Sequence, residues 1–96
     1  MEHPAPKPKA PRKADFLPRF REDLIWHIKN DRKIALKVLE LVEAVCADPF
    51  AGIGKPEALK HELAGCWSRR ITQEHRLVYR VTADRIDFLQ ARYHYS

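Results

Sequence analysis

Two helical stripes of apolar residues, separated by a very short link, constrain the fold of this 96-residue chain more than any other feature. Phe20, Leu24 and Ile28 recur at helical spacing and predict a helix over 19–29. A second helix is predicted over 32–47. Its buried stripe consists of Ile34, Val38, Leu41, Val42 and Val45. Helices joined so tightly form an αα-hairpin, and their apolar stripes need a sheet to cover them.

The rest of the chain carries the strand pattern that supplies this sheet. A short edge strand is predicted over 14–17, before a proline that can open the first helix. Four further strands are predicted over 59–63, 67–72, 76–82 and 85–93. The sequence therefore predicts an α+β fold in one domain over 14–96. It is a small antiparallel sheet of four to five strands with the N-terminal αα-hairpin packed on one face.

The register of the central hairpin follows from its apolar residues. The residues expected to share the face beneath the helices are Trp67, Ile71, Leu77, Tyr79 and Val81. For Ile71 to lie opposite Leu77, the turn must consist of residues 73–75. A one-residue slip would turn Arg76 into the core. In this register Arg69 is expected on the helix-covered face, near its rim.

The same register has a consequence for the opposite face of the sheet. Arg70 and Arg76 are expected to lie there together, because alternate residues of a strand share a face. The last hairpin leaves two alternatives. A two-residue turn pairs Val81 with Ile86, whereas a three-residue turn places His94 on the arginine face.

Composition narrows the class of protein. The net charge of +5 and the pI of about 9.5 favour a polyanionic partner. Residues 1–13 interleave prolines with basic residues and predict a disordered tail. Apolar runs are too short to span a bilayer, and the basic N-terminus lacks a secretory apolar segment. Cys46 and Cys66 lack metal-ligand spacing. We expect a cytoplasmic domain with no membrane partner, metal or cofactor.

The stretch over 54–80 concentrates groups suited to RNA-phosphate chemistry. RNA carries its own nucleophile, the 2′-OH. Cleavage therefore needs a base, an acid for the leaving 5′-oxygen and cations for the developing charge. The residue types for these roles are present: a carboxylate in Glu57, cations in Arg70, Arg76 and Lys60, and an imidazole in His94.

The segment GKPEALKHELAGCWSRRITQEHRLVYRV at 54–81, followed by ARYHY at 91–95, resembles the YoeB/Txe toxins of the RelE/ParE superfamily. The resemblance spans about 16–95. It implies a RelE-like fold and a ribosome-dependent mRNA endonuclease, or mRNA interferase, that cuts codons in the ribosomal A site without metal. It also implies a YefM/Phd-type antitoxin and a homodimer. Two departures are the Pro/Lys tail and Ser96, which follows the family's usual terminal tyrosine.

The resemblance also implies roles for individual residues. By matching position, Glu57 is the general base and His94 the general acid, with Tyr95 helping to position it. Arg70 and Arg76 are the arginines that stabilise the transition state. Three further residues are expected to bind RNA: Lys60, Arg69 and Tyr93.

Two other functions stay open at this point. One is a non-catalytic inhibitor directed against gyrase, as in another branch of the same superfamily, and the other is a plain RNA- or antitoxin-binding module. The fold cannot separate these functions, since related folds host different activities. The site can, because an inhibitor has no need of an acid–base pair around arginines, and a binding module yields no cut products.

Overall fold

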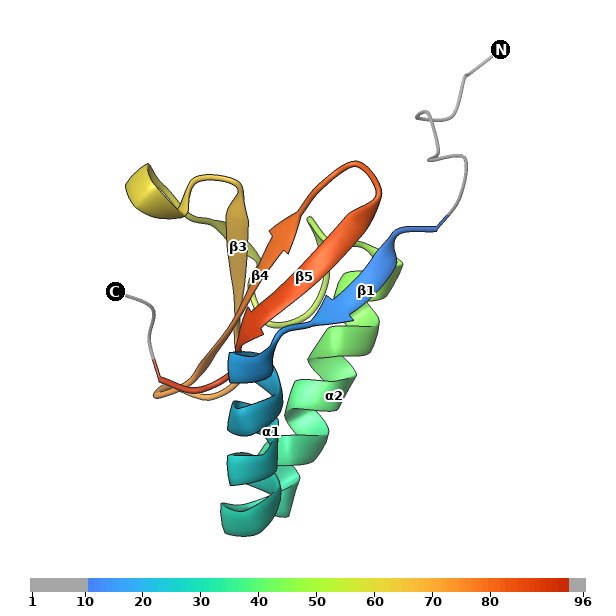
Figure 1. The fold of residues 1–96 in the computed structure, drawn as a ribbon. Helices are drawn as coiled ribbons and strands as arrows, with labels where there is room; N and C mark the ends of the chain where they lie inside the picture. The colour runs from blue at the N-terminus through green and yellow to red at the C-terminus, as the bar shows by residue number, and fades with distance from the viewer. Residues whose placement is uncertain (1–10, 94–96) are drawn as a thin grey trace.

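The computed structural model describes residues 11–93 of the chain and confirms the predicted α+β fold (Figure 1). The sheet has five strands in the order β1-β5-β4-β3-β2. The elements, in chain order, are β1 (Lys13–Phe16), α1 (Pro18–Asn30), α2 (Arg32–Ala47), β2 (Glu57–Ala58), the 3-10 helix η1 (His61–Leu63), β3 (Cys66–Arg70), β4 (Arg76–Val81) and β5 (Arg85–Gln90). The predicted tail over 1–13 lies mostly outside the described residues, and Lys13 begins β1 instead.

The second helix begins where the sequence predicts and the first begins one residue earlier, and the two lie together on one side of the sheet (Figure 1). Pro18 occupies the first turn of α1, where a missing N–H does no harm. The Asp31 carboxylate caps α2 by accepting from the Lys33 N–H at 3.0 Å. The core between helices and sheet consists of Phe20, Val38, Leu41, Val42, Val45, Ile71, Leu77, Tyr79, Ile86, Phe88 and Ala91.

The sheet departs from the predicted antiparallel arrangement in one strand. β1 runs parallel to β5, with Phe16 opposite Phe88, while the other strand pairs are antiparallel. The Leu17 N–H continues this pairing by donating to the Phe88 carbonyl at 3.1 Å. The stacked rings of Phe16 and Phe88 lie 5.0 Å apart. Because β1 leads directly into α1, this direction places the start of the helix over β5.

The predicted pairing of Ile71 with Leu77 is wrong by two residues. Arg69 lies opposite Leu77, and Arg70 lies opposite Arg76, so residues 71–75 form the connection. The cause is a tight turn in which the Ile71 N–H donates to the His75 carbonyl at 3.0 Å. A shift of two residues preserves the faces of both strands. Arg70 and Arg76 therefore still share a face, as the sequence predicts.

The ends of other strands also differ from the predictions. Residues 59–63 do not form a strand: β2 ends at Ala58, and η1 follows. Leu59 instead packs with Cys66 and Val78 in a small cluster on the face of the sheet opposite the helices. The two-residue turn of the last hairpin is confirmed, since Val81 lies opposite Ile86. β5 ends at residue 90 rather than 93, after a register irregularity at 78–79.

A steric test of this packing compares two glycines of positive φ. A Cβ on Gly54 (φ 84°) would lie 2.8 Å from Leu41 Cδ2, whereas a Cβ on Gly65 (φ 91°) would meet nothing within 4 Å. We expect Gly54→Ala to lower the free energy of unfolding by about 2–4 kcal/mol and Gly65→Ala by about 1 kcal/mol. Urea denaturation of the two variants measures both losses in the free energy of unfolding. Equal losses would show that the contact with Leu41 has no steric consequence.

Candidate active site

A turn that contains two successive residues in the left-handed backbone conformation leads the chain into the sheet at the predicted base, Glu57. Gly54 and Lys55 have φ of 84° and 52°, and Pro56 then leads into β2. The Arg70 N–H donates to the Gly54 carbonyl at 2.7 Å, which joins this turn to the end of β3. Glu57 consequently pairs with a residue in the middle of β3. The local sequence GKPE thus fixes the carboxylate next to the arginine-bearing strand.

The structure brings three of the predicted catalytic residues to one polar hollow of about 290 Å³. Its lining consists of Lys55, Pro56, Glu57, Ser68, Arg70 and Arg76. A second hollow of about 270 Å³ shares Glu57 with the first and is lined by residues 57–61. Lys60 therefore lies beside the predicted base, as its assignment to RNA binding requires.

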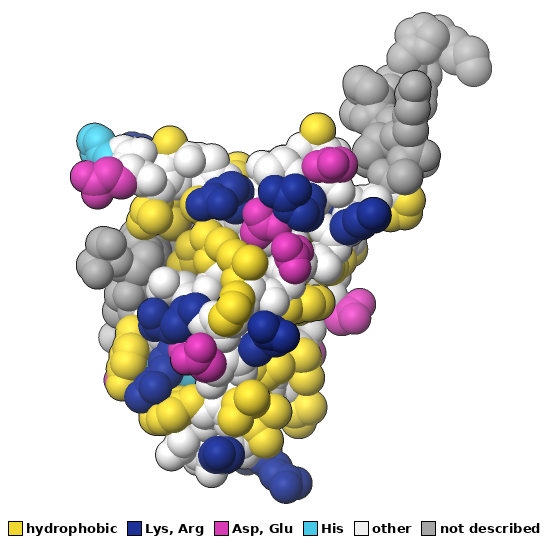
Figure 2. All heavy atoms as spheres, viewed as in Figure 1, with side chains coloured by type: hydrophobic (Ala, Val, Ile, Leu, Met, Phe, Trp, Pro, Cys, Tyr) yellow, Lys and Arg dark blue, Asp and Glu magenta, His cyan; other side chains and the backbone are white. Residues whose placement is uncertain are grey.

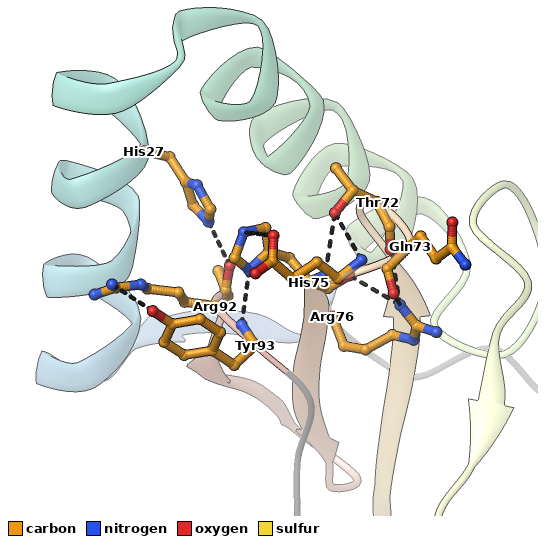
Figure 3. A network of polar contacts seen from close by, with 9 residues as sticks. His27, Thr72, Gln73, His75, Arg76, Arg92 and Tyr93 are labelled. Atoms are coloured by element: carbon orange, nitrogen blue, oxygen red, sulfur yellow. Dashed lines mark hydrogen bonds and ion pairs between the residues drawn. The ribbon is translucent and has the colours of Figure 1, made fainter.

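The cations of the hollow are direct cross-strand neighbours. Arg70 lies opposite Arg76, and like charges in such a pair destabilise a sheet unless an anion lies between them. The Arg76 Nη1 donates to the carbonyls of Thr72 (2.7 Å), Gln73 (3.2 Å) and His75 (3.2 Å). Figure 3 shows the guanidinium held against this turn. The arrangement pre-orients one arginine and concentrates positive charge where an anion would fit.

Arg69 does not take the exposed position that RNA binding requires. It lies on the helix-covered face as predicted, but it is fully buried rather than at the rim. Its Nη2 donates to the carbonyls of Asp48 and, at 3.0 Å, Ala51, and its Nη1 donates to the Ile53 carbonyl at 3.1 Å. The guanidinium is committed to this loop, so the expectation that Arg69 contacts RNA is corrected to a structural role.

Tyr79 completes this anchoring of the loop. Its hydroxyl accepts from Arg69 Nε at 3.1 Å and donates to the Pro49 carbonyl at 2.7 Å. Burial is the main cause that raises the pKa of the Tyr79 phenol above its ordinary value, so the hydroxyl keeps the proton that it donates. Residues 48–53 are thus held from within the core just before the chain enters the GKPE turn.

The predicted acid and its neighbour lie outside the described residues. His94 and Tyr95 directly follow Tyr93, the last residue that the structure describes. The Tyr93 side chain is 46% exposed, which suits its predicted role in stacking on a base. Its hydroxyl accepts from Arg92 Nη2 at 2.8 Å (Figure 3).

Two histidines are buried, although polar side chains usually lie at the surface. His27 is fully buried and His75 is 4% exposed, and their rings meet edge to face with centroids 4.8 Å apart. Spacing could have revealed His27, because residues 20, 24 and 27 also follow the helical period. Ile28, which was assigned to the stripe, is 45% exposed. No local pattern marks His75, whose burial depends on the contacts of α1 with the end of β5.

Basic residues elsewhere are balanced by acidic ones. In the view of Figure 2, basic and acidic side chains alternate over β1 and β5. One such pair is Arg85 and Asp87, joined by a 2.6 Å hydrogen bond between Nε and Oδ1. In contrast, the hollow at Glu57 has one acid among several cations. Among residues 11–93, no three His, Cys, Asp or Glu side chains are grouped in a way that could hold a metal ion.

Comparisons with known proteins agree with this geometry. Residues 16–95 match the family model described as YoeB-like toxin of bacterial type II toxin-antitoxin system. The chain is 50% identical to Toxin YoeB of Mycobacterium bovis over 84 residues, which cover 88% of this chain and 99% of the relative. It is also 50% identical to Toxin YoeB of Escherichia coli over 74 residues, covering 77% of this chain and 88% of that one.

Solved structures show the same fold. The YoeB/ParE toxin from Agrobacterium tumefaciens superposes with a TM-score of 0.82 at 40% identity, covering 86% of this chain and 99% of that chain. The YoeB–YefM complex from Staphylococcus aureus gives a TM-score of 0.76 at 40% identity, covering 90% of this chain and all of that chain. None of the helices in the part of the chain described here is long and apolar enough to cross a membrane.

The adjacent arginines provide a matched test of their different roles. Arg69→Met removes a buried guanidinium that donates hydrogen bonds to four oxygens. We expect this variant to lower the free energy of unfolding by about 2–4 kcal/mol. Arg70→Met removes an exposed charge opposite Arg76, and we expect no loss or a gain of about 0.5 kcal/mol. Chemical denaturation of both variants measures the difference. Similar stabilities would contradict the assignment of Arg69 to the fold.

His75 should make stability depend on pH. Burial, as the largest cause, lowers its pKa below the ordinary value of 6.5. Below pH 6.5 the unfolded chain takes up a proton that the folded protein resists, so stability is full above that pH and falls as pH decreases towards the folded pKa. Denaturation at several pH values should show this decline in the wild type and a smaller one in His75→Asn. The exposed His61, changed to Gln, serves as control, and an unchanged decline in His75→Asn would contradict the prediction.

Proposed function

The chain belongs to the YoeB-like toxins of bacterial type II toxin–antitoxin systems, and we propose that it is a ribosome-dependent mRNA endonuclease. The observation that carries this proposal is the polar hollow that Glu57 shares with the cross-strand pair of Arg70 and Arg76. A carboxylate beside paired arginines is suited to removing a proton next to a phosphate and stabilising the charge that follows.

The proposed reaction uses the substrate's own hydroxyl and needs no metal. Glu57 takes the proton of the 2′-OH, and the resulting oxygen attacks the adjacent phosphorus. Arg70 and Arg76 stabilise the charge of the phosphorane. The bond to the 5′-oxygen then breaks, and His94, positioned by Tyr95, donates the proton to that oxygen. The products are a 2′,3′-cyclic phosphate and a 5′-hydroxyl end.

The geometry of the arginines supports this assignment. An arginine can donate two parallel hydrogen bonds to a phosphate, and it stays charged at any relevant pH. Arg76 is held through Nη1 by three turn carbonyls, and among the described residues its Nε and Nη2 have no such bond. A donor that is oriented before the charge develops stabilises a transition state with little reorganisation.

The same surface accounts for the proposed binding of RNA on the ribosome. Lys60 lies next to Glu57 and can contact a neighbouring phosphate, while the exposed Tyr93 ring can stack on a base. The hollow presents mostly phosphate-binding groups. We therefore assign the alignment of the scissile bond to the ribosomal A site.

Partners follow from the family. Solved structures of relatives include a YoeB–YefM complex and a YoeB dimer, both from Staphylococcus aureus. We propose a YefM-type antitoxin and a homodimer for this chain as well. A basic active face is a natural target for an acidic segment that folds on binding, and coverage of the end at His94 and Tyr95 would block the acid.

The test of the proposed function is purified protein added to translating ribosomes, with mRNA 5′ ends mapped with and without translation. We expect new ends only during translation. Glu57→Gln and Arg76→Ala should each lower the cleavage rate by about a hundredfold or more, because they remove the base and an oriented cation. Glu62→Gln, an exposed glutamate in η1, is the matched control and should cleave like the wild type.

Other results would support other functions. Cleavage of free RNA at the same rate would contradict the dependence on the ribosome. RNA binding without cut products would indicate a binding module. Inhibition of DNA supercoiling without new mRNA ends would indicate a gyrase-directed inhibitor. Full cleavage by Glu57→Gln would contradict the role of the carboxylate even if the protein is a nuclease.

A further inference from the structure

The last described residues, 91–93, are fixed by hydrogen bonds to α1 and to the start of β4. The Ala91 N–H donates to Asp23 Oδ2 at 2.9 Å, and the Ala91 carbonyl bonds His27 Nε2 at 2.7 Å. Both partners belong to α1 and are buried. The Arg92 guanidinium carbon lies 3.6 Å from the centroid of the Trp26 ring, on the same helix. The end of the sheet is thus held to α1 by three neighbouring contacts.

Tyr93 is held by two consecutive residues of the central hairpin. Its N–H donates to His75 Nδ1 at 2.8 Å, and its carbonyl accepts from the Arg76 N–H at 3.1 Å (Figure 3). Tyr93 has a φ of 62°, in the left-handed region that a tyrosine adopts only when its surroundings impose it. The two bonds impose that conformation, and they attach the chain directly to the strand that carries Arg76.

The protonation of the histidine pair follows from these bonds. His27 Nε2 faces a carbonyl and must carry a proton to donate to it, whereas His75 Nδ1 faces an N–H and must be unprotonated to accept. The neutral His75 ring then carries its proton on Nε2, which lies 3.6 Å from Glu74 Oε1. The edge-to-face contact with His27 fixes the plane of the His75 ring.

We infer that His75 is a positioning residue whose Nδ1 holds the backbone of Tyr93, the residue directly before the proposed acid, His94. This inference rests on the proposed function, in which His94 donates a proton to the leaving oxygen. His75 contacts no reacting atom. It acts through the backbone of Tyr93, and Arg76 contributes both its guanidinium to the phosphate and its N–H to the same attachment.

The surroundings of His75 keep Nδ1 available as an acceptor. Burial lowers its pKa, and His27 and Arg92 act in the same direction, whereas Glu74 and Asp23 oppose them. His27 and Asp23 face it from α1, Arg92 from beyond β5, and Glu74 from the turn. The ring therefore stays neutral near pH 7. A proton on Nδ1 would replace the attraction to the Tyr93 N–H with repulsion.

The experiment compares two replacements of His75 in the full chain. Asparagine keeps an acceptor near the position of Nδ1, because its Oδ1 is the same number of bonds from Cα. Phenylalanine fills the ring's volume but cannot accept a hydrogen bond. Glu74→Gln, which alters the side of the ring facing Nε2, is the matched control. The readouts are kcat and KM for mRNA on translating ribosomes and, independently of activity, hydrogen exchange of the Tyr93 amide.

We expect His75→Phe to lower kcat by about a hundredfold, because the acid is misplaced, and to raise KM by a smaller factor, because Tyr93 loses the same bond while the other substrate-binding groups remain. Exchange of the Tyr93 amide should accelerate about tenfold, as expected for the loss of one hydrogen bond. His75→Asn should recover most of both properties, and Glu74→Gln should match the wild type. Circular dichroism verifies that each variant is folded.

Three outcomes would overturn the inference. Full kcat in His75→Phe, or equal losses of kcat in the Phe and Asn variants, would show that the acceptor has no role in positioning. Unchanged exchange at Tyr93 in His75→Phe would show that Nδ1 does not hold that amide. A wild-type protein that cuts no mRNA would instead overturn the proposed function, and the catalytic part of the inference with it. The exchange measurement separates these cases.

Discussion

The contacts of the buried Arg69 guanidinium connect the core of this protein to its candidate site. A buried cation loses its hydration and is tolerated only where polar groups replace the water. Here the replacements are the carbonyls of Asp48, Ala51 and Ile53 and the hydroxyl of Tyr79. The loop between α2 and β2 has no regular backbone pairing of its own over 48–53, so these bonds determine its path and the entry into the GKPE turn.

Adjacent residues of β3 therefore have different roles on the two faces of the sheet. Arg69 points into the core and fixes the loop, while Arg70 faces the polar hollow opposite Arg76. The alternation of a strand enforces this division, because successive side chains leave on opposite faces. The loop that Arg69 holds leads into the turn before Glu57, and Glu57 lies in the same hollow as Arg70. The spacing between base and cations thus depends on a contact made on the other side of the sheet.

The sequence was sufficient to predict which residues share a face of the sheet, but not the exact register of the strands. Alternation assigned Arg70 and Arg76 to one face, and an error of two residues left that assignment intact. The turn at 71–75 closes through backbone hydrogen bonds to the His75 carbonyl, and no residue pattern predicts these bonds. Burial of His75 and Arg69 was missed for a related reason, since polar residues are expected at the surface unless tertiary partners compensate them.

In the proposed function, the hollow at Glu57, Arg70 and Arg76 cleaves RNA by activating the substrate's own 2′-OH. The most direct measurement uses ribosomes programmed with an mRNA that carries one 2′-deoxynucleotide on the 5′ side of the mapped cut. Activation of the 2′-OH requires that this mRNA stays intact at that bond, while the all-ribose mRNA is cut and yields a 2′,3′-cyclic phosphate. Cleavage of the deoxy-substituted bond at an undiminished rate would contradict it.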